Sequence, residues 1–149
     1  MRRILAGLAG LAVAASPLPR FAAAVATQSP VSLREAGDSA RAAWERRDLA
    51  TFLAPAKGGR LLVTLPGGRE SAPIGPAQAR ALLASYVQGT EEVTTTLQAA
   101  RVVDSLQGYV ELKRRYRQVG LPGDREAMIL LGFRRGREIW VLTEVRIAP

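Results

Sequence analysis

Apolar and polar positions alternate at helical spacing in the first half of the chain. The capping-box motif Ser32-x-x-Glu35 precedes apolar residues that recur every three or four positions, which predicts that a helix starts here. Asp48 is a suitable N-cap for a short second helix, which a proline then ends because it lacks the backbone donor. A Gly-Pro pair predicts a third helix over 76–87, followed by Gly89 at its C-terminus.

The pattern changes to a period of two after residue 90. Four segments there are rich in β-branched residues or alternate between apolar and polar positions, and turn residues separate them. They are 93–103, 108–119, 127–133 and 139–147. Earlier in the chain, a strand over 60–65 is followed by a Pro-Gly-Gly turn and a short return strand over 69–74. This order predicts an α+β fold, in which N-terminal helices pack on a curved antiparallel sheet.

Alternation in the last predicted strand assigns its two faces. Five residues share one face, which is predicted to be the core face. These are Ile139, Val141, Thr143, Val145 and Ile147. Trp140 and Leu142 lie on the other face, where they would form an apolar patch that a second copy could cover in a homodimer. The alternative is a monomer with Trp140 flat on its surface. In the preceding strand, 128–131 is apolar without alternation, which predicts burial on both faces.

The N-terminal segment has the pattern of a secretory signal. A positively charged start precedes an apolar run over 4–15, and small residues follow as far as Ala26. The run is shorter than the roughly 20 apolar residues of a spanning helix, so a cleaved signal peptide is favoured. The alternative is that the segment is retained as a membrane anchor. We expect a signal peptide over 1–26, cleaved near Ala26/Thr27 or two residues earlier, and one domain over 27–149. The mature protein is then periplasmic or secreted by a bacterium, and it meets the membrane only transiently during export.

The composition removes several classes of chemistry. The chain has 149 residues, of which 48% are hydrophobic and 23% charged, as in a folded globular domain. It contains no His and no Cys, which excludes imidazole-based triads, thiol nucleophiles, disulfides and thiolate zinc sites. No metal-ligand spacing and no cofactor motif is found, so neither a metal nor a cofactor is predicted. The formal net charge is +8, but export and the scattered aromatic residues argue against nucleic-acid binding.

The predicted meander carries candidate ligand-binding side chains. Arg114 and Tyr116 share an apolar face near a strand end, where they could hold an anionic or carbonyl ligand. The alternative is a solvated arginine beside a packed tyrosine. Asp104 could be a general base at a pocket mouth, or it could bond the backbone of its own turn. The three arginines within 134–137 could bind lipid headgroups or another polyanion, or only keep the surface soluble.

Three further segments form a familiar combination. They are the helical stretch 40–50 (ARAAWERRDLA), the Gln78-Ala79 helix that ends in Leu83-x-x-Tyr86, and the closing strand 136–142 (GREIWVL). Together they resemble the nuclear-transport-factor-2-like superfamily, including its small exported bacterial members of unknown function. The resemblance implies a cystatin-like α+β cone, whose interior is an active site in ketosteroid isomerases and polyketide-cyclase-like enzymes and a binding or dimer surface elsewhere. It adds Tyr86 to the candidate ligand-binding residues.

The resemblance carries no catalytic residue over to this chain. Dehydratase chemistry needs paired His, and the isomerase pattern of a Tyr donor with two acids is only partly present. The sequence favours an exported, non-catalytic envelope protein that binds a small apolar or anionic ligand, or a protein partner, through its cone or sheet face. One alternative is a pocket enzyme of isomerase or polyketide-cyclase type that uses Tyr and a carboxylate. Another is a structural dimer whose cone is filled by its own side chains.

Overall fold

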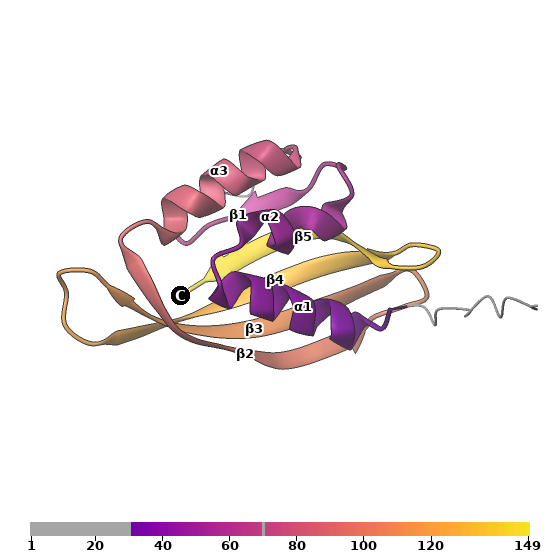
Figure 1. Ribbon diagram of the computed structural model, residues 1–149. Helices are drawn as coiled ribbons and strands as arrows, with labels where there is room; N and C mark the ends of the chain where they lie inside the picture. Colours follow the sequence, from indigo (N-terminus) through magenta and orange to yellow (C-terminus); the bar gives the residue numbers. More distant parts are fainter. Residues whose placement is uncertain (1–30, 70) are drawn as a thin grey trace, which may run out of the picture.

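The computed structural model describes residues 31–69 and 71–149, in which helices pack against one sheet (Figure 1). The predicted signal peptide over 1–26 lies outside these residues. The helices are α1 (Leu33–Glu45), α2 (Leu49–Leu53) and α3 (Pro76–Val87), with a short 3-10 turn, η1, at Ala54–Ala56. The strands are β1 (Leu62–Thr64), β2 (Thr90–Val102), β3 (Gln107–Gln118), β4 (Asp124–Arg135) and β5 (Trp140–Ala148).

Side-chain caps define the starts of α1 and α2. The Ser32 hydroxyl accepts a hydrogen bond from the Glu35 backbone N–H at 3.1 Å, and the Ser32 N–H donates to the Glu35 carboxylate at 2.7 Å. This backbone N–H, helped by the Ser32 hydroxyl, lowers the pKa of Glu35 below its ordinary value. Asp48 accepts from the Thr51 N–H at 3.0 Å, and Gly89 follows α3 with a φ of 71°. The predicted helix boundaries are therefore confirmed.

The cap of α1 provides a stability test. Ser32→Ala is expected to lower the free energy of unfolding by about 0.5–2 kcal/mol, because it removes the acceptor for an N-terminal N–H of the helix. Ser39→Ala, at an exposed position inside α1, is the matched control and should leave that free energy unchanged or slightly higher. Urea unfolding followed by circular dichroism measures both variants. Equal stabilities of the two variants would contradict a stabilising capping box.

The strands form one five-stranded sheet in the order β1-β5-β4-β3-β2. Strands β2 to β5 pair antiparallel, which confirms the predicted meander. β1 pairs in parallel with β5, with Val63 opposite Val145, so the sheet is mixed and not wholly antiparallel. Among the described residues of 69–74, the predicted return strand is reduced to one bridge between Leu61 and Ile74.

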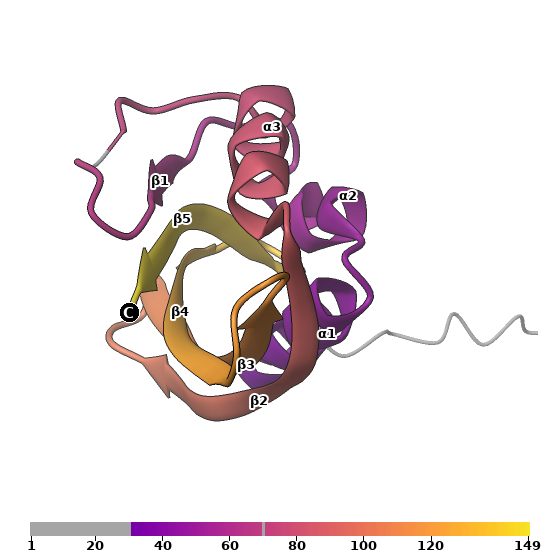
Figure 2. The same ribbon diagram turned by 90° about the vertical axis from the view of Figure 1, so that its left-hand side faces the viewer.

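Bulges bend the sheet around α1. The register of β2 against β3 shifts between Glu92 and Thr94 and again between Leu97 and Ala99. An extra residue in one strand bends it and increases its local twist. Figure 2 shows the result, since β2 to β5 follow an arc and α1 lies at its open side. α1 packs on β2 and β3, which confirms the expected α+β cone.

A bulge in β5 changes which of its residues face the core. The pairing with β4 skips Thr143, so the alternation of inward and outward side chains shifts by one residue there. Beyond the bulge, Val145 and Ile147 are buried, as predicted. Before it, Trp140 and Leu142 face the core and are only 5% and 2% exposed. The prediction that Trp140 and Leu142 form an exposed dimer face is therefore wrong.

The core lies between the helices and the concave face of the sheet. Strand β4 crosses its centre, with Ile129 and Leu131 fully buried on the concave side. Met128 and Leu130 alternate with them and are half-buried on the opposite side. Burial on both faces, expected from the unbroken apolar run, is thus only partial. The outer face of the sheet stays accessible in this structure.

Candidate functional site

A polar cluster occupies the interior of the cone. Five side chains form this cluster, which we call the cone cluster. They are Trp44 of α1, Tyr86 of α3, Glu92 of β2, and Arg114 and Tyr116 of β3. The Arg114 side chain is 0% exposed and that of Glu92 is 7% exposed. Arg114 Nε donates to Glu92 Oε2 at 2.9 Å, which makes this ion pair the centre of the cluster. None of the four main hollows in the described part of the chain is lined by a member of the cluster.

The Glu92 carboxylate points into the cone and is fully engaged there. Trp44 Nε1 donates to its Oε1 at 3.2 Å, and Thr95 Oγ1 donates to the same oxygen at 2.8 Å. Arg114 Nε bonds both oxygens, at 3.3 Å and 2.9 Å. A general base needs an oxygen within reach of the proton it removes. Glu92 could accept a proton from a substrate only after one of these hydrogen bonds is broken.

Three aromatic rings surround the Arg114 guanidinium. Its Cζ lies 4.1 Å from the ring centroid of Tyr116, 5.3 Å from that of Tyr86 and 5.4 Å from that of Trp44. Such contacts offset part of the loss of hydration that a buried cation suffers. Nη2 donates to Thr90 Oγ1 at 3.0 Å, whereas Nη1 is buried and has no hydrogen-bond partner among the described residues. Burial raises the pKa of Tyr86, and the charge of Arg114 acts against that shift.

The structure brings together three of the four residues predicted to bind a ligand. Arg114, Tyr116 and Tyr86 belong to the cone cluster, where they fill the cone and do not line an opening. Asp104 lies elsewhere, exposed in the turn between β2 and β3. Its carboxylate accepts from two backbone N–H groups of that turn, at 2.7 and 2.8 Å. Of the two roles predicted for Asp104, bonding to the backbone of its own turn is confirmed, and the role as a pocket residue is wrong because this turn is exposed.

Sequence reasoning missed Glu92 and Trp44. Glu92 follows another glutamate, and a bulge at Val93 decides which residues of this strand face inward. Trp44 belongs to the apolar stripe of α1, so its pattern indicated only core packing. One available signal was Arg114 itself, because an arginine on the apolar face of a strand needs a buried partner. That signal indicates that a partner exists but does not identify it.

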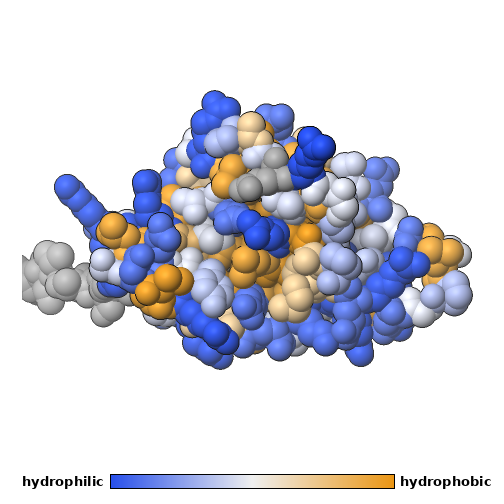
Figure 3. Space-filling view, turned by 180° about the vertical axis from the view of Figure 1, so that it is seen from behind, coloured by the Kyte–Doolittle hydropathy of each residue, from blue (hydrophilic) through white to orange (hydrophobic). Residues whose placement is uncertain are grey.

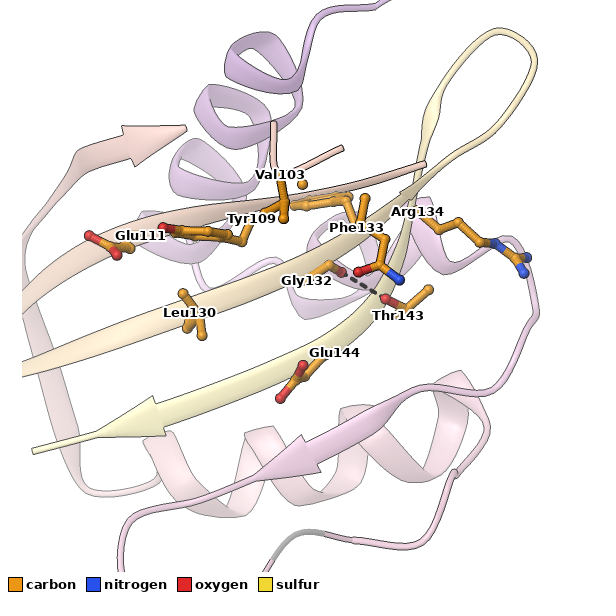
Figure 4. A pocket seen from close by; sticks show the side chains of 11 residues that line it. Val103, Tyr109, Glu111, Leu130, Gly132, Phe133, Arg134, Thr143 and Glu144 are labelled. Carbon is orange, nitrogen blue, oxygen red and sulfur yellow. Dashed lines mark hydrogen bonds between the residues drawn. The ribbon is translucent and has the colours of Figure 1, made fainter. Parts of the chain in front are cut away.

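The largest of the main hollows lies on the outer face of the sheet. Its volume is about 630 Å³. Figure 3 shows this face, where apolar surface in the middle is surrounded by hydrophilic surface. In the close view of Figure 4, Tyr109 and Glu111 of β3 lie along one side of the hollow. Glu144 of β5 lies along the other side, with Leu130 and Gly132 of β4 between them.

Two carboxylates give this hollow a negative character. Glu144 accepts from Arg146 at 2.7 Å, whereas Glu111 forms no ion pair with another residue of 31–69 or 71–149. Arg134 lines the hairpin end of the hollow and points away from both carboxylates in Figure 4. A Cβ at Gly132 would lie 3.0 Å from the Cβ of Glu144. The glycine therefore leaves space between the two carboxylates.

The part of the chain that the structure describes contains neither a cluster suited to a metal ion nor a helix suited to a membrane. In residues 31–69 and 71–149, no group of three or more His, Cys, Asp or Glu side chains could hold a metal ion. Within the same two stretches, no helix is both long and apolar enough to cross a bilayer.

Comparison with known proteins finds likeness only among solved structures. No family model matches the sequence, and no curated protein matches it. A ketosteroid isomerase-like protein from Erwinia carotovora atroseptica matches with a TM-score of 0.64 and 12% identity, over 78% of this chain and 92% of that one. An NTF-2-like protein of unknown function from Shewanella oneidensis matches with 0.56 and 13%, over 78% and 96%. A cystatin-like domain of unknown function from Nostoc punctiforme matches with 0.56 and 19%, over 78% and 74%.

These likenesses identify the fold. The chain has the fold of the nuclear-transport-factor-2-like superfamily, the cystatin-like α+β cone, as the sequence resemblance implied. Its structural neighbours include small bacterial proteins of unknown function beside an isomerase-like protein. At such low identity the fold does not decide between binding and catalysis, so the side chains described above must carry that argument.

Proposed function

We propose that this chain is an exported, non-catalytic binding protein that binds through the outer face of its sheet and not through its cone. The partner we propose for that face is a second copy of the chain. The observation that carries the proposal is the buried Arg114–Glu92 pair, because it occupies the interior that other members of this fold use as a pocket. Export is supported by the signal-peptide pattern over 1–26.

The energetics of the cone cluster argue against a ligand in the cone. A ligand that entered between Arg114 and Glu92 would separate two charges from which water is excluded. Removing one partner of such a pair typically destabilises a protein by about 3–5 kcal/mol. A small apolar or anionic ligand would have to offset that loss. The enzyme alternative meets the same obstacle, because the carboxylate it would use is held by Trp44, Thr95 and Arg114.

The outer face has the charge pattern of a self-complementary surface. Glu111 and Glu144 make the hollow negative, while Arg134 at its end is exposed and positive. In a two-fold interface the same patch meets itself, so the acidic part of one copy can lie against the basic part of the other. Met128 and Leu130, both half-buried, supply an apolar centre of the kind that protein interfaces contain.

Leu130→Arg is expected to convert the dimer into a monomer, because it places a charge in the apolar centre of the proposed interface. Size-exclusion chromatography with light scattering gives the mass of each species. Leu82→Arg, on an exposed position of α3, is the matched control and should remain dimeric. Glu111→Arg should also weaken the dimer, and it does so without replacing a packed side chain.

Native mass spectrometry of protein recovered after expression with its own N-terminal segment separates the alternatives. The expected spectrum is a dimer whose subunit mass starts at Thr27. A monomer at all accessible concentrations would contradict the proposed partner. A monomer with an additional bound mass would indicate a small-molecule ligand instead, and an unprocessed chain would contradict export.

A further inference from the structure

The hairpin between β2 and β3 presents three aliphatic side chains to solvent at one end of the molecule. Val102, Val103 and Leu106 are 57%, 62% and 63% exposed. The Asp104 carboxylate accepts from two backbone N–H groups of the turn and so maintains its shape. Figure 3 shows apolar residues protruding at the ends of the outer face. Grouped exposed aliphatic residues mark surfaces that meet an apolar phase or a partner.

Arginines surround this hairpin tip. The Arg135 N–H donates to the Leu106 carbonyl at 2.7 Å, so the end of β4 lies directly against the tip. Four arginines near the tip are exposed, and none forms an ion pair within 4.0 Å with another residue of the two described stretches. They are Arg101, Arg134, Arg135 and Arg137. The acidic side chains of the two hairpins at this end are Asp104 and Glu138, so the end is net positive.

The opposite end of the sheet differs in its charges. Its hairpin also exposes aliphatic residues, with Val119 at 65% and Leu121 at 47%. There, however, Asp124 pairs with Arg117 at 2.8 Å and with Arg115 at 3.5 Å. Among the described residues, the end formed by the β2–β3 and β4–β5 hairpins has four exposed arginines without an ion pair, whereas at the β3–β4 hairpin Arg115 and Arg117 are paired and Arg125 is not.

The chain enters the domain at this same end. The Val31 N–H donates to the Glu138 carbonyl at 3.2 Å, which places the first described residue against the β4–β5 hairpin. The sequence before Val31 includes the apolar run over 4–15, which is expected to direct the chain to a membrane before the signal peptide is cleaved. The arginine-rich end is the part of the domain that follows this segment.

We propose that this end, the β2–β3 hairpin tip with its surrounding arginines, docks on an anionic lipid surface. The aliphatic side chains enter the boundary between headgroups and acyl chains, and the guanidinium groups bind lipid phosphates as paired hydrogen-bond donors. Each basic residue close to an anionic bilayer strengthens binding about fivefold. The docking surface overlaps the outer-face hollow at Val103 and Arg134, so the tests below change neither of these two residues.

A fluorescent label tests which end meets the membrane. Because the chain has no Cys, Ser105→Cys at the tip and Leu121→Cys at the opposite hairpin each create one labelling site for an environment-sensitive dye. With vesicles that contain phosphatidylglycerol, the label at residue 105 should shift to the blue and the label at 121 should not. Vesicles of phosphatidylcholine alone should shift neither label. An N-terminal segment that bound the vesicles by itself would leave the residue 105 label in water and overturn the proposal.

Charge and apolar variants of the full chain supply the second measurement. Arg101→Gln with Arg137→Gln should weaken vesicle binding about 25-fold, and Val102→Ser with Leu106→Ser should weaken it at least tenfold. The matched controls are Arg115→Gln with Arg125→Gln and Val119→Ser with Leu121→Ser, which make the same changes at the other end. Equal losses for test and control variants would mean that net charge or general apolarity drives binding, and the proposal would fail.

Discussion

Replacing Arg114 with methionine is expected to lower the free energy of unfolding by about 3–5 kcal/mol, measured by guanidinium unfolding at neutral pH. Arg114 is 0% exposed and its Nε lies 2.9 Å from Glu92 Oε2. Methionine fills much of the same space but carries no charge, so Glu92 would remain buried without a cation. The variant also removes the cation that lies over the rings of Tyr86 and Tyr116.

A double variant separates the ion pair from simple packing. Glu92→Gln with Arg114→Met removes both charges, and it should recover most of the stability lost in Arg114→Met. Arg117→Met is the matched control on the same strand, where the side chain is 60% exposed and should contribute little to stability. A loss in Arg114→Met below about 1 kcal/mol, the range of exposed ion pairs, would contradict the burial of this pair.

The same cluster explains why this fold need not have an open cone here. An open pocket leaves polar side chains in contact with water, whereas this chain surrounds one cation with a carboxylate and three aromatic rings. The interior is thereby stabilised as a core, which favours the outer face of the sheet over the cone as the binding surface proposed above. The filled cone is therefore one reason to propose that binding occurs on the outer face, at Glu111 and Leu130.

Local signals made the helices predictable. Ser32 and Asp48 accept hydrogen bonds from N–H groups three residues later, and Gly89 adopts a positive φ just after the last turn of α3. Each signal therefore lies within a few positions of the helix end that it defines. The alternating segments after residue 90 likewise predicted four strands of the meander. The parallel pairing of β1 with β5 was not predictable, because nothing near Val63 indicates a partner more than eighty residues later.

The members of the cone cluster were predictable only in part for a related reason. The alternation of β3 placed Arg114 and Tyr116 on the inner face correctly. Their partner Glu92 lies beside a bulge, and a bulge arises from the pairing of two strands and not from the residues of one. The same cause exchanged the two faces of β5 before Thr143. Sequence alternation is reliable along an unbroken strand and fails wherever a bulge interrupts it.

The bulge in β5 leads to the second prediction of large effect. Leu142→Ala is expected to lower the free energy of unfolding by about 2–5 kcal/mol, because Leu142 is 2% exposed and its truncation leaves a cavity in the core. Val141→Ala, one residue earlier and on the half-buried outer side, should change it by less than about 1 kcal/mol. Urea unfolding of both variants, followed by tryptophan fluorescence, measures the difference.

A second valine makes this test independent of side-chain size. Val145→Ala is the same substitution as Val141→Ala, but Val145 is fully buried beyond the bulge. Strict alternation along β5 would place both valines on the core face and give equal losses of stability. The extra residue at Thr143 places only Val145 there, so Val145→Ala should be clearly less stable than Val141→Ala. A large loss for Val141→Ala together with a small one for Leu142→Ala would mean that β5 has no bulge, and Trp140 and Leu142 would again be the candidate dimer face.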